Sequence, residues 1–372
     1  MSATGSSTPL QRLSELGQSV WIDYLSREIV RNGHLAELIE QDAVVGVTSN
    51  PTIFEHAMDA GESYDEEVSV LAREGTRIDE IFWRMARQDV ADACDTLRPV
   101  HQRSGGNDGF VSIEVDPSLA FETLATYRAA ISLHEQIDRE NLLVKIPATK
   151  PGLAAIEDVI AKGRSINVTL IFSLQRYAEV AESYIRGLER LVAAGGDPAR
   201  VRSVASFFVS RIDTEADRRL DQIGGHDELK GRLAIANAKL AYQHFKEVFA
   251  GERWEQLAGK GARPQRVLWA STSTKNPAYS DILYVEELIG PETVNTMPEE
   301  TLRAYQDHGD PKLRLESGLE EARGLYEELA AAGVDYDDVT ATLEREGVEK
   351  FAESFAKLIN TLQSKVKALA AA

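Results

Sequence analysis

The fourth apolar segment of the chain reads Leu142-Leu143-Val144-Lys145-Ile146-Pro147. A continuous apolar run of this length is typical of a strand that is buried on both faces in a parallel sheet. Similar segments rich in Val, Ile, Phe and Trp lie at 20–24, 44–49, 110–116, 165–172, 203–210, 266–271 and 293–297. The sequence therefore predicts eight short strands.

Stretches with helical periodicity separate these segments. For example, Leu174, Tyr177, Ala181, Tyr184 and Leu188 fall on one helix face before a glycine pair ends the run. Strands that alternate with helices indicate parallel β-α units, and eight of them favour a (β/α)8 TIM barrel over an open doubly wound sheet. No glycine fingerprint for a dinucleotide opens any of these helices.

We expect one domain over residues 1–372, with two additions to the barrel. The segment from about 55 to 108 is longer than a crossover helix requires and has the pattern of two or three helices. From about 311 to 372 the pattern is almost entirely helical. These C-terminal helices are expected to cover the outside of the barrel and part of its mouth.

Composition excludes several classes of protein. A formal net charge of -19 and a pI near 4.9 argue against a surface for nucleic acid or anionic membrane. The single cysteine, Cys94, allows no intramolecular disulfide, and the histidines lack the repeated spacing of a metal site. There is no apolar run of about 18 residues, and the stretch 1–7 lacks the pattern of a secretory signal. We therefore expect a cytoplasmic protein.

Lys145 is the unusual residue of its strand. Desolvation favours the neutral form of an amine, which can attack a carbonyl carbon and form a Schiff base. This interpretation predicts carbonyl chemistry without a cofactor. The alternative is a structural lysine that reaches out of the strand end or pairs with a buried carboxylate.

Polar residues stand at or near the carboxyl ends of nearly all the predicted strands, where barrels of this type place their chemistry. Each has a structural alternative: Asn50 could form a turn, Asp23 a helix cap and Asn167 a strand-edge amide. Their recurrence on successive strands nevertheless indicates a site. The candidates are Asp23, Asn50, Glu114, Lys145, Asn167, Thr169, Ser206, Arg211, Ser271 and Lys275.

Four ordered motifs lie on these strands: GVTSNPTIF at 46–54, VSIEVD at 111–116, LVKIPAT at 143–149 and INVTLIFS at 166–173. Together they resemble the transaldolase family, and the similarity runs from about residue 10 to the C-terminal helices. The length, the insertion and the run GPETVNTMP at 290–298 resemble the longer transaldolases of actinobacterial type.

The resemblance implies transfer of a dihydroxyacetone unit between sugar phosphates in the non-oxidative pentose phosphate pathway. The donor is fructose 6-phosphate or sedoheptulose 7-phosphate, and the acceptor is erythrose 4-phosphate or glyceraldehyde 3-phosphate. Lys145 forms the imine with the donor, and Glu114 acts as acid and base through a water positioned by Thr169. Asp23 exchanges the proton of the C4 hydroxyl. This chemistry requires no metal and no organic cofactor.

The resemblance also implies the substrate-binding residues. Asn50 and Asn167 hold the dihydroxyacetone hydroxyls, and Arg211 with Ser206 binds phosphate. The seventh strand departs from the common family pattern, because ASTSTKN at 270–276 has lysine where arginine is usual and is two residues longer. Lys275 is the expected phosphate ligand there, and Ser271 and Ser273 are both candidates for the serine.

Two other functions remain open. One is a related fructose 6-phosphate aldolase, which releases free dihydroxyacetone. Those aldolases typically have glutamine at the position of Glu114 and tyrosine at the position of Phe208, which favours transfer here. The other is a catalytically silent barrel that binds sugar phosphates. The expected partners are small sugar phosphates, with no nucleic acid or membrane, and the chain is expected to be a monomer or a homodimer.

Overall fold

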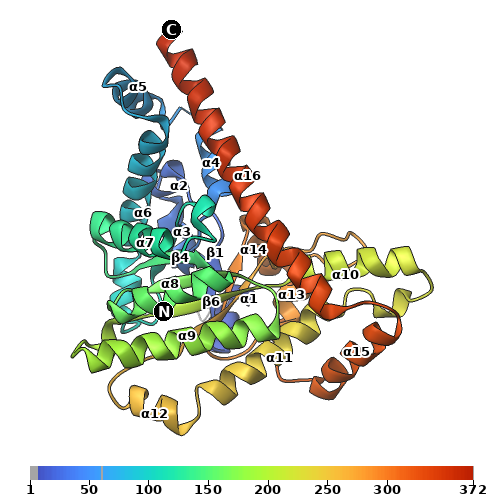
Figure 1. Ribbon diagram of the computed structural model, residues 1–372. Coiled ribbons are helices and arrows are strands. Elements are labelled where there is room, and N and C mark those ends of the chain that lie inside the picture. Colours follow the sequence, from blue (N-terminus) through green and yellow to red (C-terminus); the bar gives the residue numbers. More distant parts are fainter. Residues whose placement is uncertain (1–6, 60–61, 372) are drawn as a thin grey trace, which may run out of the picture.

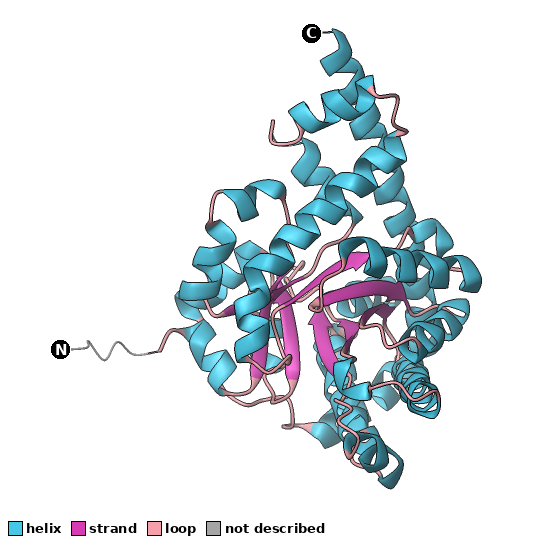
Figure 2. Ribbon diagram, turned by 90° about the vertical axis from the view of Figure 1, so that its left-hand side faces the viewer, coloured by secondary structure: helices cyan, strands magenta, loops and turns pink. Residues whose placement is uncertain are grey.

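In the computed structural model, which describes residues 7–59 and 62–371, eight parallel strands form a closed barrel in sequential order. Each strand pairs with its neighbours in the chain, and the first closes the barrel against the last. Helices surround this barrel on the outside (Figure 2). The strands are β1 (Gln18–Ile22), β2 (Val44–Val47), β3 (Phe110–Glu114), β4 (Leu142–Pro147), β5 (Ile166–Ile171), β6 (Ser203–Phe208), β7 (Arg266–Ala270) and β8 (Thr293–Met297).

The predicted (β/α)8 barrel is confirmed, and only the first strand is displaced from its predicted place. β1 begins at Gln18 rather than at residue 20, because Gln18 pairs in register with Thr293 of β8. The polar side chain of Gln18 is fully buried and donates to the Leu288 carbonyl at 2.7 Å. A hydrophobic pattern cannot identify a strand residue of this kind. Asp23, which the prediction places inside the strand, follows its end.

The crossover helices follow the predicted alternation (Figure 1). α1 (Pro9–Glu15) precedes the first strand, and α2 (Arg27–Arg31) and α3 (His34–Gln41) lead to β2. The remaining crossovers contain α7 (Thr123–Ile137), α8 (Lys150–Ala161), α9 (Leu174–Ala193), α10 (Ser210–Ile223), α11 (Leu233–Val248), α12 (Glu252–Ala258), α13 (Leu283–Glu287) and α14 (Glu299–His308), with short 3-10 turns η1 (Pro117–Leu119), η2 (Pro198–Arg200) and η3 (Asp227–Leu229).

Large side chains fill the barrel, and its amino-terminal end is closed by polar contacts. Trp21 of β1 is fully buried against Gly46 of β2, where a Cβ atom would lie 2.4 Å from the indole ring. The Trp21 indole N–H donates to Asp108 at 3.3 Å, and Asp108 forms an ion pair of 2.9 Å with Arg266. The amino-terminal end of the barrel is therefore closed by packed side chains. The opposite end, at the carboxyl ends of the strands, is where barrels of this type place their active sites.

The long segment between β2 and β3 contains three helices, α4 (Pro51–Asp59), α5 (Asp65–Arg73) and α6 (Ile78–Arg103). A buried charge network fixes this segment to the barrel. The guanidinium of Arg27 in α2 forms ion pairs with Glu67 of α5 at 2.7 Å and with Asp89 of α6 at 2.8 Å. These ion pairs join α5 and α6 to α2, and removing one partner would leave an uncompensated buried charge.

Two helices follow the barrel, α15 (Leu319–Ala331) and α16 (Tyr336–Ala371). α16 starts beside α10, crosses the barrel and continues along α4 and α5 to the C-terminus (Figure 1). It thereby joins the late part of the chain to the helices that follow β2. None of the helices in the described part of the chain is long and apolar enough to span a membrane. Residues 1–6 of the stretch considered above for a secretory signal lie outside the described residues.

Candidate active site

The side chain of Lys145 points into the barrel from the middle of β4. Its residue pairs in register with Glu114 of β3 on one side and with Asn167 of β5 on the other. The ammonium donates to the Ser49 carbonyl at 3.0 Å and lies 3.4 Å from Oε2 of Glu114. Both side chains are almost completely buried, with 7% and 3% of their surface exposed. The lysine is therefore in a dry site beside a carboxylate.

Glu114 ends β3 and has unsatisfied oxygens. Neither carboxylate oxygen has a hydrogen-bond partner among the residues that the structure describes. Burial raises the pKa of Glu114, and the negative charge of Asp23 adds to this effect, while Lys145 and Arg211 oppose it. Thr169 Oγ1 on β5 is also buried without a partner in the described chain. Buried polar atoms of this kind are available to a substrate or to a water.

Asp23 lies directly after β1 and is held by Thr48, which directly follows β2. The Thr48 hydroxyl donates to Oδ1 of Asp23 at 2.6 Å and lies 2.7 Å from the hydroxyl of Thr296 on β8. Burial raises the pKa of Asp23, and Lys145, the Thr48 hydrogen bond and Arg211 lower it in part. The site thus contains two carboxyl groups whose protons are held more tightly than usual.

Asn167 and Ser206 form a buried polar chain across the barrel. The Ser206 hydroxyl donates to Oδ1 of Asn167 at 2.7 Å, and the Asn167 amide donates to Oγ of Ser112 at 3.1 Å. These contacts fix the orientation of the amide next to Lys145. The resemblance groups Ser206 with Arg211, but among the described residues the two side chains share no hydrogen bond.

Phe208 is the last residue of β6, and Arg211 lies near it in the first turn of α10. The Arg211 guanidinium is 5.1 Å from the centre of the Phe208 ring, and Phe208 contacts Phe172 at 5.1 Å. Burial lowers the pKa of Arg211, and the charges of Asp23 and Glu114 oppose this shift. Asn50 is half-buried at the start of α4, where its side chain accepts from the Ile53 amide at 3.0 Å. Its side-chain amide nitrogen has no hydrogen-bond partner among the residues that the structure describes, so its N–H groups can donate to a ligand.

The loop after β7 holds the last candidates at the edge of the site. Ser271 has a left-handed backbone, with φ of 57°, and its hydroxyl lies 3.0 Å from that of Ser210 in α10. Lys275 is exposed and donates to Oγ of the buried Ser273 at 2.7 Å. Both serines thus remain candidates, one facing α10 and the other contacting the lysine.

Three neighbours of Lys145 and Asp23 are absent from the candidates that sequence identifies. Thr48 and Ser49 stand inside the 46–54 motif, so their position beside Asn50 is the signal that could have identified them. The third is Phe351 of α16, whose ring centre is 5.9 Å from Lys145 Nζ and 6.0 Å from Arg211 Cζ. The sequence shows only that Phe351 belongs to the apolar face of a helix, which does not indicate that it lies near the site.

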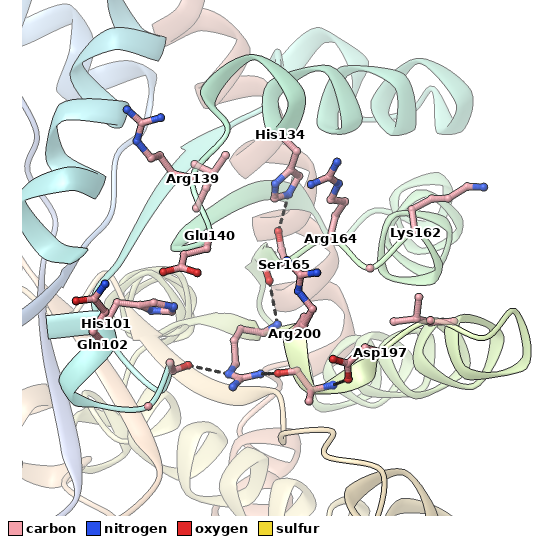
Figure 3. Close-up of a pocket in the computed structure, with 18 residues that line it drawn as sticks. His101, Gln102, His134, Arg139, Glu140, Lys162, Arg164, Ser165, Asp197 and Arg200 are labelled. Atoms are coloured by element: carbon pink, nitrogen blue, oxygen red, sulfur yellow. Dashed lines mark hydrogen bonds between the residues drawn. The ribbon is translucent and has the colours of Figure 1, made fainter. Parts of the chain in front are cut away.

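A large cavity lies elsewhere and is lined by none of the candidates. It has a volume of about 650 Å³ and is lined by residues such as His134, Arg164, Ser165 and Arg200, near the amino-terminal ends of β4, β5 and β6 (Figure 3). Several of its basic residues follow helix carboxyl ends, where positive charge stabilises the helix dipole. The size of a cavity is therefore a weaker indication of function than buried ionisable groups, and those groups define the candidate site at the other end of the barrel.

The comparisons with known proteins agree with this geometry. Residues 20–362 match the family described as Transaldolase/Fructose-6-phosphate aldolase. A protein named transaldolase from Saccharopolyspora erythraea is 51% identical over 96% of this chain and 97% of its own length. Transaldolase 1 from Streptomyces avermitilis is 52% identical over 96% of each chain, and transaldolase from Mycobacterium ulcerans is 51% identical over 97% of this chain and 98% of its own. The chain therefore belongs to the transaldolase/fructose-6-phosphate aldolase family.

Proposed function

We propose that this protein is a transaldolase, which moves a dihydroxyacetone unit from a ketose phosphate to an aldose phosphate through a Schiff base on Lys145. The observation that carries the proposal is the position of the amine. It is buried inside the barrel, 3.4 Å from one carboxylate, with a second carboxyl group at the end of β1. A buried amine that can pass its proton to a neighbouring carboxylate is suited to attack a carbonyl.

In the first step, Lys145 Nζ attacks the C2 carbonyl of the ketose and forms a carbinolamine. Loss of water then gives the imine, and both stages require protons to move between nitrogen and oxygen. Glu114 is close enough to exchange these protons, directly or through a water held between its free oxygens and Thr169. Its raised pKa makes it a stronger base than an ordinary glutamate.

In the second step, the C3–C4 bond breaks and its electrons pass into the protonated imine, which becomes an enamine. Asp23 accepts the proton of the C4 hydroxyl as the aldehyde product forms. The reverse sequence joins the enamine to the acceptor aldehyde, and Asp23 returns the proton to the new hydroxyl. Thr48 holds the carboxylate for this task with a hydrogen bond of 2.6 Å. Imine hydrolysis finally frees Lys145.

The remaining candidates bind the substrate in this proposal. Asn167 lies next to Lys145 on the neighbouring strand. Together with Asn50 it contacts the dihydroxyacetone hydroxyls. Arg211 binds the phosphate, since a guanidinium can offer two parallel hydrogen bonds. Ser206 orients Asn167. Lys275 lies farther out, on an exposed loop, and adds positive charge for phosphate.

The test measures glyceraldehyde 3-phosphate release from fructose 6-phosphate, with and without erythrose 4-phosphate. We expect release that requires the acceptor. Equal release without acceptor would instead identify an aldolase. Borohydride reduction in the presence of donor should attach the three-carbon unit to Lys145, which peptide mapping detects. The Lys145→Ala variant should lose both turnover and trapping, and a variant that keeps turnover would exclude the imine mechanism.

A further inference from the structure

Phe351 reaches the active site from the far end of the chain. It lies on α16, is 7% exposed, and its ring centre is about equally distant from the ammonium of Lys145, at 5.9 Å, and from the guanidinium of Arg211, at 6.0 Å. Lys145 lies inside the barrel and Arg211 beyond the end of β6. The ring therefore covers the space between the imine-forming amine and the phosphate-binding residue.

α16 is seated at this position by a close approach one helical turn earlier. A Cβ atom on Gly347 would lie 3.1 Å from Cδ2 of Leu170 and 3.4 Å from Cε2 of Phe172. Leu170 has a φ of 61°, and the pairing of β5 with β6 is irregular between Val168 and Ile171. The irregular backbone of β5 at Leu170 thus places the side chain of Leu170 against α16. The absence of a side chain at residue 347 lets α16 approach the barrel mouth closely enough for Phe351 to cover Lys145.

The next turn of α16 is held by the helical segment that follows β2. The ring of Phe355 packs against Phe82 at 5.5 Å and Trp83 at 6.0 Å. Those three rings also border a cavity beside Glu114 and Asn50 that measures only about 10 Å³. A buried water requires about 10–15 Å³, so this cavity has room for one water at most. The contacts of Phe355 thus pack α16 closely against the segment that follows β2.

We propose that Phe351 shields the three-carbon enamine on Lys145 from water and so determines that the unit is transferred rather than released. This inference rests on the proposed function. Release requires a proton at the enamine carbon, then a water that adds to the imine carbon, after which the C–N bond breaks and free dihydroxyacetone leaves. In transfer, the acceptor aldehyde forms a carbon–carbon bond at the enamine carbon in place of that proton, and water is needed only afterwards, when the product imine is hydrolysed. An apolar ring that keeps water, the source of the proton, away from the enamine therefore slows release and does not prevent the new carbon–carbon bond.

The test compares two rates in each variant: glyceraldehyde 3-phosphate formation from fructose 6-phosphate without acceptor, and the same formation with saturating erythrose 4-phosphate. Phe351→Ala removes the cover, and we expect the ratio of the first rate to the second to rise at least about tenfold, a barrier difference of about 1.4 kcal/mol. Phe351→Leu keeps an apolar group without the aromatic ring, so its ratio should stay near that of the unaltered enzyme.

Leu358→Ala is the matched control. Leu358 is fully buried on α16 about two turns beyond Phe351, so the substitution removes apolar volume from the same helix at a distance from Lys145. Thermal melting shows whether each variant is folded, and Phe351→Val replaces the alanine variant if that one is unfolded. The control should lose stability and keep the original ratio.

Three results would overturn the inference: an unchanged ratio in a folded Phe351→Ala or Phe351→Val variant, an equal rise in Leu358→Ala, or an equal rise in Phe351→Leu. The second would mean that any loosening of α16 admits water, and the third that the ring acts through its interaction with the two cations. Failure of the proposed function is distinguishable, because the unaltered enzyme would then show no acceptor-dependent release at all.

Discussion

The hydrogen bond from Thr48 to Asp23 offers the sharpest test of the two-carboxyl mechanism. Thr48→Val removes the hydroxyl that donates to Oδ1 of Asp23 at 2.6 Å and keeps a branched side chain of similar size. A hydrogen bond to a charged group contributes about 1.5–3 kcal/mol. At about 1.36 kcal/mol per pKa unit, its loss should raise the pKa of Asp23 by about one to two units.

The sign of the effect follows from the role of Asp23. Burial already places the pKa of this carboxyl above its usual value, and the Thr48 hydrogen bond is one of the groups that lower it. In the proposed mechanism, cleavage requires the ionised form of Asp23, because this carboxylate accepts the proton of the C4 hydroxyl. Without Thr48 the carboxyl stays protonated to higher pH. The acid limb of the kcat/KM profile should therefore move upward by the same one to two units, with less change at alkaline pH.

The assay is the pH dependence of kcat/KM for acceptor-dependent glyceraldehyde 3-phosphate release, sampled at fixed times so that the coupling enzyme always works at its own pH. Thr296→Val is the control, because it removes the hydroxyl 2.7 Å from Thr48 and leaves the Thr48–Asp23 bond in place. An acid limb that does not move in Thr48→Val would refute the reasoning. An equal upward movement of the acid limb in Thr296→Val would also refute it, because the change would then come from general loosening of the ends of β1, β2 and β8.

Two further outcomes follow from charges near the site. Arg211→Ala should reduce kcat/KM for phosphorylated donors about 10- to 150-fold, as expected for lost hydrogen bonds to a charged group. Lys275→Ala should reduce kcat/KM less, because Lys275 is exposed. Steady-state kinetics with both variants checks this order. Asp213, two residues beyond Arg211, is buried and accepts from the Tyr284 hydroxyl at 2.9 Å, and burial raises its pKa to about 7. The pKa of Asp213 is higher in the folded state than in the unfolded state, so its contribution to stability is complete below about pH 4 and is lost as the pH rises through about 7. Urea unfolding between these pH values should therefore show the free energy of unfolding falling by up to about 4 kcal/mol. The Asp213→Asn variant should not show this fall.

The barrel and the residues inside its strands could be predicted from sequence because strand geometry is regular. Alternation and parallel register place Glu114, Lys145 and Asn167 at one level on three neighbouring strands, as the pairing of β3, β4 and β5 shows. Polar residues just after the strands, such as Asp23, meet at the same edge for the same reason. Gln18 was misjudged because a buried polar residue does not follow the hydrophobic pattern.

Contacts made by distant segments could not be predicted in this way. The periodicity of α16 indicates that one face is buried, but it does not say what that face covers. Phe351 reaches Lys145 only because the bulge at Leu170 and the missing side chain at Gly347 let the helix approach. Likewise, the hydroxyl of Ser206 donates to Asn167 on the neighbouring strand, a contact that the resemblance does not predict because it groups Ser206 with Arg211.

Sequence left two interpretations of Lys145, a nucleophile or one half of a buried ion pair, and the geometry makes them compatible. At rest the ammonium does lie 3.4 Å from Glu114. A buried ion pair of this kind adds little stability, because the cost of removing both charges from water offsets most of their attraction. Stability alone is therefore a weak reason to keep a lysine in β4, where an apolar residue would fit the barrel interior. In the proposed mechanism the same carboxylate receives the proton that Lys145 loses before it attacks a carbonyl, so the ion pair is the resting form of the proposed nucleophile rather than an alternative to it.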